Sequence, residues 1–253
     1  LCYTSNSQIC VSNLLPGEKA DVQVTHFQSQ RKLGFAHVIK RYNNSSDRVE
    51  PACPKFGSCG SCQWQHIAYH EQLRLKHLQL KKLFPDSTVI HPVIPAPREG
   101  LYGRRVSKLV AVGKRQLRLG AYKPRSHDVI EMSDCKLVTP ELAAVTKTLV
   151  HHCNRLGIRG YSEQTKEGQL RYVVPKQSLQ GDIQLSLIVF DDIHQSRLDE
   201  LVQDIHKRHP AVKSITLHFN KTSGNSIWDK QANLSQIRSN RSPRGFPVVT
   251  LST

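Results

Sequence analysis

The sequence predicts an α+β protein, in which a partial β-barrel of short strands precedes a larger α/β domain. Three features of the 253 residues predict this fold class. Between residues 8 and 41, short apolar–polar alternations are separated by turn signals, as in small barrels. After residue 139, apolar stripes at helical spacing alternate with apolar strands, which indicates an α/β layer. Between these regions, residues 53–62 form a loop with three cysteines and two glycines.

The first region is predicted to contain about three strands. They cover Ile9 to Val11, Ala20 to Val24 and Gly34 to Ile39, and Leu15-Pro16-Gly17 is a turn signal. Short strands with basic residues between them suit a barrel of the oligonucleotide-binding (OB) kind, here incomplete. We therefore expect three regions: a partial OB-like domain over residues 1–46, a central α/β domain over residues 47–236 and an irregular tail over residues 237–253.

A helix is predicted directly after the cysteine loop. Tyr69, Leu73, Leu80 and Phe84 fall on one apolar stripe, and Pro85 ends the pattern. Basic residues occupy much of the remaining surface of this helix. They indicate either a solvated face or a face directed at phosphates.

A second helix begins at Thr139-Pro140-Glu141, which offers a capping hydroxyl, a proline and an acid in the first turn. Its apolar stripe includes Cys153, and Gly157 suits the C-terminal cap. The further elements predicted are strands over residues 170–174, 183–190 and 212–219, and a helix from Ser196 with Asp199 as its capping-box acid.

The cysteine loop predicts a metal site. Cys53, Cys59 and Cys62 fall within ten residues, and Gly57 and Gly60 permit a sharp bend through positive φ. Three converging thiolates indicate a metal ion or a cluster with a fourth ligand from elsewhere. Buried structural cysteines, or a disulfide between two of the three, are the weaker alternatives.

The fourth ligand must come from a distant part of the chain. Cys2, Cys10, Cys135 and Cys153 are the candidates. We select Cys135 because it lies in a predicted turn, whereas Cys153 lies on an apolar helix stripe. His66 is a substitute that would favour zinc. Spacing alone does not separate zinc from an iron–sulfur cluster.

Composition points to a polyanionic partner. The net charge is +16 and the isoelectric point is about 9.7, which favours a nucleic-acid ligand. Seven cysteines without a signal peptide indicate a reducing, cytoplasmic setting, and no apolar run is long enough to cross a membrane. Because the chain starts at Leu1 rather than Met, we expect an upstream piece to be missing.

The most basic segment is residues 98–125, predicted as two strands joined near Gly113. A sheet with one apolar and one cationic face would bind RNA mainly by neutralising phosphates. Tyr122 could stack on a base or pack in the core. The candidate RNA-binding residues are Arg104, Arg105, Lys108, Arg118, Lys123 and Arg125.

Together these motifs resemble the RNA uracil-5-methyltransferases. The resemblance runs from about residue 9 to about residue 229. It rests on Asn13-Leu14-Leu15-Pro16-Gly17-Glu18, on residues 51–67 around the cysteines, and on Asp134-Cys135 with Pro140-Glu141-Leu142. It implies a TRAM domain, which is a small OB-like barrel, and a central domain that binds ribosomal or transfer RNA. It also implies a [4Fe-4S] cluster held by Cys53, Cys59, Cys62 and Cys135, and one departure is Ser61, where the family usually has glycine.

A larger departure concerns catalysis. The family carries a Rossmann-like domain that binds S-adenosylmethionine and supplies the catalytic cysteine, and no strand here leads into a glycine-rich loop opening a helix. We therefore expect no catalytic residue in this chain. S-adenosylmethionine would serve only if a methyltransferase domain, for example a separately encoded one, were supplied. Whether the chain is an enzyme part, a non-catalytic RNA-binding module or a zinc-stabilised nucleic-acid-binding domain stays open at this point.

Overall fold

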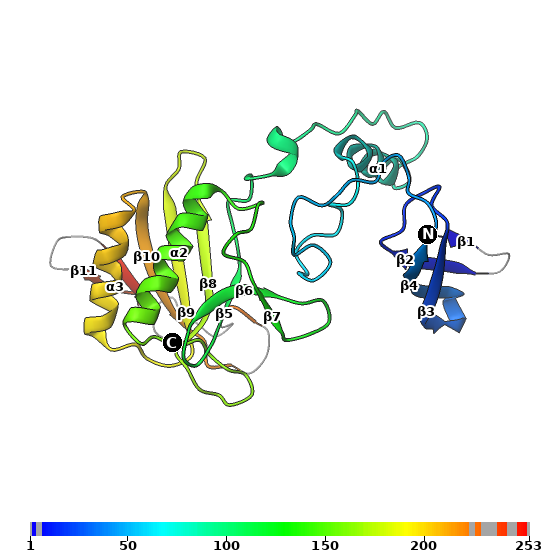
Figure 1. Cartoon of the computed structure of the whole chain (residues 1–253). Coiled ribbons are helices and arrows are strands. Elements are labelled where there is room, and N and C mark those ends of the chain that lie inside the picture. Colours follow the sequence, from blue (N-terminus) through cyan, green and yellow to red (C-terminus); the bar gives the residue numbers. More distant parts are fainter. Residues whose placement is uncertain (1, 4–6, 223–225, 229–236, 242–246, 252–253) are drawn as a thin grey trace. The chain divides into compact units, whose positions relative to one another are not determined.

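The computed structural model describes residues 2–3, 7–222, 226–228, 237–241 and 247–251 (Figure 1). The chain divides into two compact units. The first unit consists of residues 1–56 and 62–95, and the second of residues 57–61 and 96–253. The boundaries of these units differ from those of the predicted domains. The predicted domain boundaries stay predictions.

The first unit contains a four-stranded sheet in the order β1-β2-β4-β3. β2 and β4 are parallel, and the other neighbours are antiparallel. The three predicted strands are confirmed, while closure of this sheet into a TRAM barrel stays a prediction. The elements are β1 (Cys2–Tyr3), β2 (Gln8–Ser12), β3 (Ala20–Gln28), the short 3-10 helix Ser29–Arg31 and β4 (Leu33–Arg41).

A buried carboxylate holds the segment after β4 against this sheet. Glu18 accepts hydrogen bonds from the backbone N–H groups of Leu15 (2.9 Å) and Ser45 (3.2 Å) and from Nη2 of Arg48 (2.8 Å). The Arg41 guanidinium lies 3.3 Å from the same carboxylate. The bond from Arg48 is the main cause that lowers the pKa of Glu18 to about 2. The polar segment that contains Ser45 and Arg48 is therefore a fixed part of the unit.

Helix α1 (Tyr69–Lys81) is confirmed but differs from its predicted packing. Tyr69 and Leu73 are half-buried, whereas Leu80 and Phe84 are exposed. The buried residue of the helix is Glu71, whose carboxylate pairs with Arg74. Apolar spacing located this helix correctly but did not identify its buried face.

The second unit is built on an eight-stranded mixed sheet in the order β11-β12-β10-β9-β8-β5-β6-β7. β9, β10 and β12 run parallel, and the remaining neighbours are antiparallel. The strands are β5 (Leu109–Val112), β6 (Arg118–Tyr122), β7 (Val129–Glu131), β8 (Leu170–Gln177), β9 (Ile183–Val189), β10 (Val212–Phe219), β11 (Ile237–Arg241) and β12 (Pro247–Leu251). A 3-10 turn, Pro97–Gly100, precedes β5.

In the second unit, strands β7, β11 and β12 are additions to the prediction. The tail expected to be irregular contains β11 and β12. Residues 242–246 of that tail lie outside the described residues. The β-branched residues Val248, Val249 and Thr250 favour a strand. This strand, β12, joins the sheet by parallel pairing with β10.

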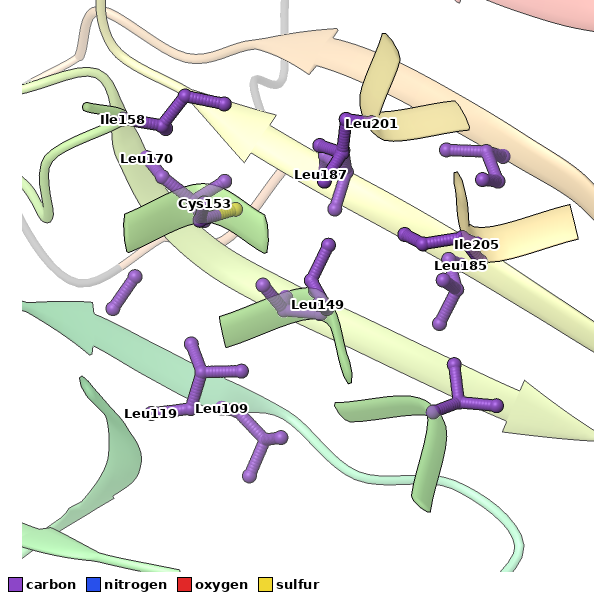
Figure 2. Packing of buried hydrophobic residues seen from close by; sticks show 14 of the residues in the cluster. Leu109, Leu119, Leu149, Cys153, Ile158, Leu170, Leu185, Leu187, Leu201 and Ile205 are labelled. Carbon is purple, nitrogen blue, oxygen red and sulfur yellow. The ribbon is translucent and has the colours of Figure 1, made fainter. Parts of the chain in front are cut away.

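Helices α2 (Pro140–Arg155) and α3 (Gln195–Arg208) cover one face of this sheet (Figure 1). Leu149 and Cys153 of α2 point into the same apolar cluster as Leu187 of β9 and Ile205 of α3 (Figure 2). Because the apolar stripes of both helices are buried, the α/β layer is confirmed. Gly157 follows α2 with φ +67°, as predicted for its C-terminal cap.

Neither predicted N-terminal cap forms. The Thr139 hydroxyl hydrogen-bonds to Oε1 of Gln177 at 2.6 Å and makes no capping bond. α3 starts at Gln195, so Ser196 lies inside the helix, and Asp199 accepts a bond from the Gln195 side chain (2.8 Å). At Thr139, a tertiary hydrogen bond takes the hydroxyl that would otherwise cap α2. At Ser196, the helix begins one residue earlier than predicted, so this residue is no longer at the capping position.

Candidate nucleic-acid interface and metal centre

In the first unit, the cysteine loop is closed at its base. Residues Arg48 and Ile67 form an antiparallel bridge, and the backbone N–H of Val49 donates to the carbonyl of His66 (3.1 Å). The backbone N–H of Cys53 donates to Oε1 of Gln65 at 3.1 Å. These bonds bring the chain before Cys53 next to the chain after Cys62, although the sequence pattern showed only their spacing.

In the second unit, residues 57–61 approach the β6–β7 connection. A Cβ added to Gly60 would lie 3.0 Å from the carbonyl oxygen of Tyr122, which is too close for most side chains. The Ser61 hydroxyl lies 3.9 Å from the sulfur of Met132. Gly57 has φ +82°, as predicted, whereas Gly60 does not have positive φ. Glycine at position 60 is required by the close backbone approach and not by the predicted conformation.

Cys135 lies in a turn, as the sequence predicts. Its N–H donates to the carbonyl of Met132 (3.3 Å), and its own carbonyl accepts from Val138 (3.3 Å). The side chain is partly buried against the main core. The turn that presents Cys135 therefore includes Met132, the residue that Ser61 contacts.

The remaining cysteines differ in their surroundings. Cys153 is 1% exposed in the core, and burial raises its pKa to about 12, so its predicted structural role is confirmed. Cys10, Cys53, Cys59, Cys62 and Cys135 are partly exposed. The side chain of Cys2 lies outside the described residues. Among the residues with described side chains, no three His, Cys, Asp or Glu groups are gathered as metal ligands.

His66, the substitute ligand, is buried and lies 5.3 Å from the ring of Phe56 between centroids. Burial, with a smaller contribution from Arg48, lowers its pKa and so favours the neutral ring. Its Nδ1 has no hydrogen-bond partner among the described residues. A neutral imidazole is the form that binds zinc.

The predicted RNA-binding residues lie around the β5–β6 hairpin and the segment before it. Lys108, Arg118, Lys123 and Arg125 are exposed, whereas Arg104 and Arg105 are half-buried. Nη1 of Arg105 donates to the Ser178 carbonyl at 2.9 Å, and Nζ of Lys123 lies 3.4 Å from Asp128.

The hairpin separates these cations into two groups. Arg118 pairs with Val112 at the turn end of the hairpin, while Lys108 and Lys123 lie at the opposite end. The second face of the sheet, opposite α2 and α3, carries a small apolar cluster that includes Val110 and Tyr172. The expected cationic face is therefore not found, because buried apolar residues occupy both faces and basic residues gather at the strand ends.

The second face also carries a polar site that no sequence pattern predicted. A cavity of about 260 Å³ lies over β5 and is lined by residues of β5, β6 and β8 and by Tyr161, Ser162, Glu163 and Gln164. At its edge, Arg171 is 2% exposed and donates from Nη2 to Glu163 (2.6 Å) and from Nη1 to the carbonyls of Asn220 and Thr222 (both 2.9 Å). An arginine inside the otherwise apolar strand 170–174 was the signal that could have indicated it.

None of the described helices is long and apolar enough to cross a membrane.

Comparison with known proteins gives consistent likenesses. No family model matches the chain. A protein of Halalkalibacterium halodurans named as an uncharacterized RNA methyltransferase is 34% identical over 224 residues, which cover 86% of this chain and 48% of that protein. A similarly named protein of Staphylococcus epidermidis is 28% identical over 88% of this chain and 50% of its own length. The chain thus spans about half the length of the curated relatives it matches.

The fold is also similar to a solved structure. A crystal structure of Pyrococcus abyssi tRNA (uracil-54, C5)-methyltransferase in complex with S-adenosyl-L-homocysteine matches with a TM-score of 0.63 and 17% identity. The match covers 87% of this chain and 49% of that one. At this identity the likeness concerns the fold alone. The likenesses in sequence support a relationship between this chain and the proteins named as RNA methyltransferases.

Proposed function

We propose that this chain is the RNA-recognition part of an S-adenosylmethionine-dependent RNA uracil-5-methyltransferase-like protein that acts on ribosomal or transfer RNA. The observation that carries the proposal is the 34% identity, over 86% of the chain, to a protein named as an RNA methyltransferase. The net charge of +16 agrees with a polyanionic ligand. A soluble cytoplasmic setting is part of the same proposal.

The cations around the β5–β6 hairpin would bind the RNA backbone. Exposed Lys and Arg side chains neutralise phosphates and release counterions, so their contribution depends strongly on salt. Arg104 and Arg105 precede Lys108 on the segment that leads into β5, and the backbone of Arg104 bonds to Leu137 and Thr139. A backbone fixed in this way would present the three cations together.

The test is the salt dependence of RNA binding by the full chain, measured by anisotropy of a labelled RNA. Replacing Arg104, Arg105 and Lys108 by alanine should flatten the slope of log K against log salt by about 2–3, since each lost phosphate contact removes about 0.7–0.9. A charge-matched control replaces the exposed Arg197, Lys207 and Arg208 of α3 and should leave the slope close to its original value. A slope unchanged by the first triple variant would move the RNA surface elsewhere.

A non-catalytic RNA-binding module is the second candidate. It is favoured by the lack of a recognisable glycine-rich cofactor loop in these 253 residues, since methyl transfer needs a bound methyl donor. The chain alone, given RNA and S-adenosylmethionine, should transfer no methyl group. Methylated uracil in that reaction would exclude the module.

We further propose that Cys53, Cys59, Cys62 and Cys135 hold a [4Fe-4S] cluster. The donor set fits, because all four are partly exposed cysteines, and four cysteine thiolates are the usual ligands of such a cluster. The contact of Ser61 with Met132 supports an approach of the loop to the turn at Cys135. The role of the cluster would be structural, because it would fasten the cysteine loop to the turn at Cys135. The alternative to this cluster is a zinc site with His66 as one ligand. The buried ring of His66, whose lowered pKa favours the neutral form, would suit zinc.

A further inference from the structure

The cavity over β5 combines accessible aromatic rings with a carboxylate. Tyr122 is half-buried, His127 is exposed, and their ring centroids are 5.5 Å apart in an edge-on arrangement. Both residues line the cavity, and so does Glu163. The volume of about 260 Å³ lies below the range of about 300–1,000 Å³ typical of sites for drug-sized ligands. The cavity therefore suits a single ring system.

The rings differ in how much of them a ligand could reach. Phe190 stacks on Tyr161 with centroids 4.4 Å apart, and the Arg171 guanidinium lies 4.9 Å from the centroid of the same ring. Tyr161 lines the cavity but is only 6% exposed, so its ring is not accessible for stacking. Tyr122 is the better stacking platform because it is only half-buried. Burial raises the pKa of Tyr122, which keeps its phenol protonated at neutral pH.

Glu163 is held in place but keeps accepting capacity. One carboxylate oxygen accepts from Arg171 (2.6 Å) and the other from Lys166 (3.2 Å). A carboxylate can accept about four hydrogen bonds, so its oxygens can accept further bonds from a ligand beside these two. The side chain of Glu163 is 31% exposed, whereas that of Arg171 is 1% exposed. The buried arginine fixes the carboxylate, and the carboxylate is the group that a ligand can reach.

We propose that this pocket binds one unstacked nucleobase of single-stranded RNA, with its ring on Tyr122 and its N–H edge on Glu163. Guanine is the base that fits best, because its N1–H and N2–H donors are adjacent and match the two oxygens of a carboxylate. Stacking on an aromatic side chain and hydrogen bonding to a base edge are the usual means of reading unpaired RNA. The inference rests on the proposed function and adds a base preference to it.

Cations near the pocket agree with an RNA ligand. Lys114 lines the cavity, and its ammonium pairs with Glu167 at 2.9 Å. Both side chains of that pair are more than half exposed, so a phosphate can displace the glutamate at little cost. Arg125 is exposed in the β6–β7 connection that also contains His127.

The experiment compares short oligouridylates that carry one central guanine, inosine, adenine or uracil, at a fixed salt concentration. Inosine lacks the N2 amine and so loses one of the two donors. The full chain should bind the guanine oligomer about tenfold more tightly than the inosine one, as expected for one hydrogen bond to a charged acceptor. Adenine and uracil should bind no better than inosine.

Two variants separate the pocket from general RNA binding. Glu163→Gln should reduce the guanine-to-inosine ratio to about one, while its amide oxygen can still accept from Arg171. The matched control Glu141→Gln makes the same charge change at an exposed position of α2 and should keep the ratio. Tyr122→Leu should weaken binding of all four oligomers about tenfold through lost stacking.

Three outcomes would overturn the pocket. Equal affinity of the unmodified chain for all four oligomers would leave RNA binding intact and remove the base site. A guanine preference that survives in Glu163→Gln would place that site elsewhere. Binding of none of the oligomers at any salt concentration would remove both the pocket and the proposed function.

Discussion

The two compact units of this chain are stabilised in different ways. In the second unit, side chains of α2, α3 and five strands form one continuous apolar core (Figure 2). In the described part of the first unit, the buried apolar side chains are Leu15, Ala36 and Ile67. That unit instead has a buried carboxylate with arginine partners, and it contains two of the four proposed cluster ligands, Cys53 and Cys62. A small core needs such additional fastening.

The chain's two tryptophans allow the units to be followed separately. Trp64 lies in the first unit and Trp228 in the second. Replacing Trp228 by phenylalanine leaves a reporter of the first unit, and replacing Trp64 leaves a reporter of the second. Each unit can then be assigned its own unfolding transition, which a chain of two units requires.

The largest effect is expected from the apolar core of the second unit. Leu149→Ala should lower the stability of that unit by about 2–5 kcal/mol, because Leu149 is fully buried and leaves a cavity. Denaturant unfolding followed by Trp228 measures the change. Leu179→Ala, at a position 81% exposed, is the control and should change stability by less than about 0.5 kcal/mol. A similar loss followed by Trp64 would contradict the separation of the units.

Acid should weaken the first unit through Glu18. Its folded pKa of about 2 lies below the ordinary value of 4.5, so its stabilising effect is complete above pH 4.5 and is lost as pH falls towards 2. The loss should reach about 3 kcal/mol, since each pKa unit corresponds to about 1.4 kcal/mol. Unfolding followed by Trp64 between pH 5 and pH 2 measures it.

Glu18→Gln is the matched test of this pH dependence. The amide keeps the shape of the side chain but has no charge that titrates, so the variant should be weaker at pH 7 and less sensitive to acid. If the variant showed the same acid transition as the unmodified chain, other carboxylates would be responsible.

The smallest effect is expected from the exposed ion pairs between α2 and α3. Arg155 pairs with Glu200 and with Asp204, both at 2.6 Å, but its side chain is 44% exposed. Arg155→Met should cost only about 0.2–1 kcal/mol and less at high salt, because water screens exposed pairs. Unfolding of the second unit, followed by Trp228 at low and high salt, measures this change in stability. A loss as large as that of Leu149→Ala would contradict the claim that the apolar core contributes most of the stability of this unit.

The sequence predicted the second unit more closely than the first. In α2 and α3, the apolar stripe of the sequence is the helix face that packs into the core. The spacing of apolar residues therefore predicted which side chains are buried. In α1 the pattern failed, since the buried residue is Glu71, whose ion pair with Arg74 compensates its burial. Caps also failed where tertiary bonds took the side chain, as with Thr139 and Gln177.

The candidate site was predictable only in part. Cysteine spacing predicted a metal-binding loop, which stays a prediction, and charge clustering located the basic residues around the hairpin, because both signals are local in sequence. The cavity beside Arg171 brings together residues from β5, β6, β8 and a loop, and Arg171 bonds to Asn220 and Thr222 far along the chain. No local pattern could show this, although a charged residue in an apolar strand was a usable signal.

The most direct test of the account is the metal content of the full chain purified without oxygen. We expect about four iron and four acid-labile sulfide per chain, as in a [4Fe-4S] cluster. Cys135→Ser should lose the cluster, whereas Cys10→Ser, at another partly exposed thiol, should keep it. Zinc without sulfide, or a full cluster in Cys135→Ser, would contradict the account.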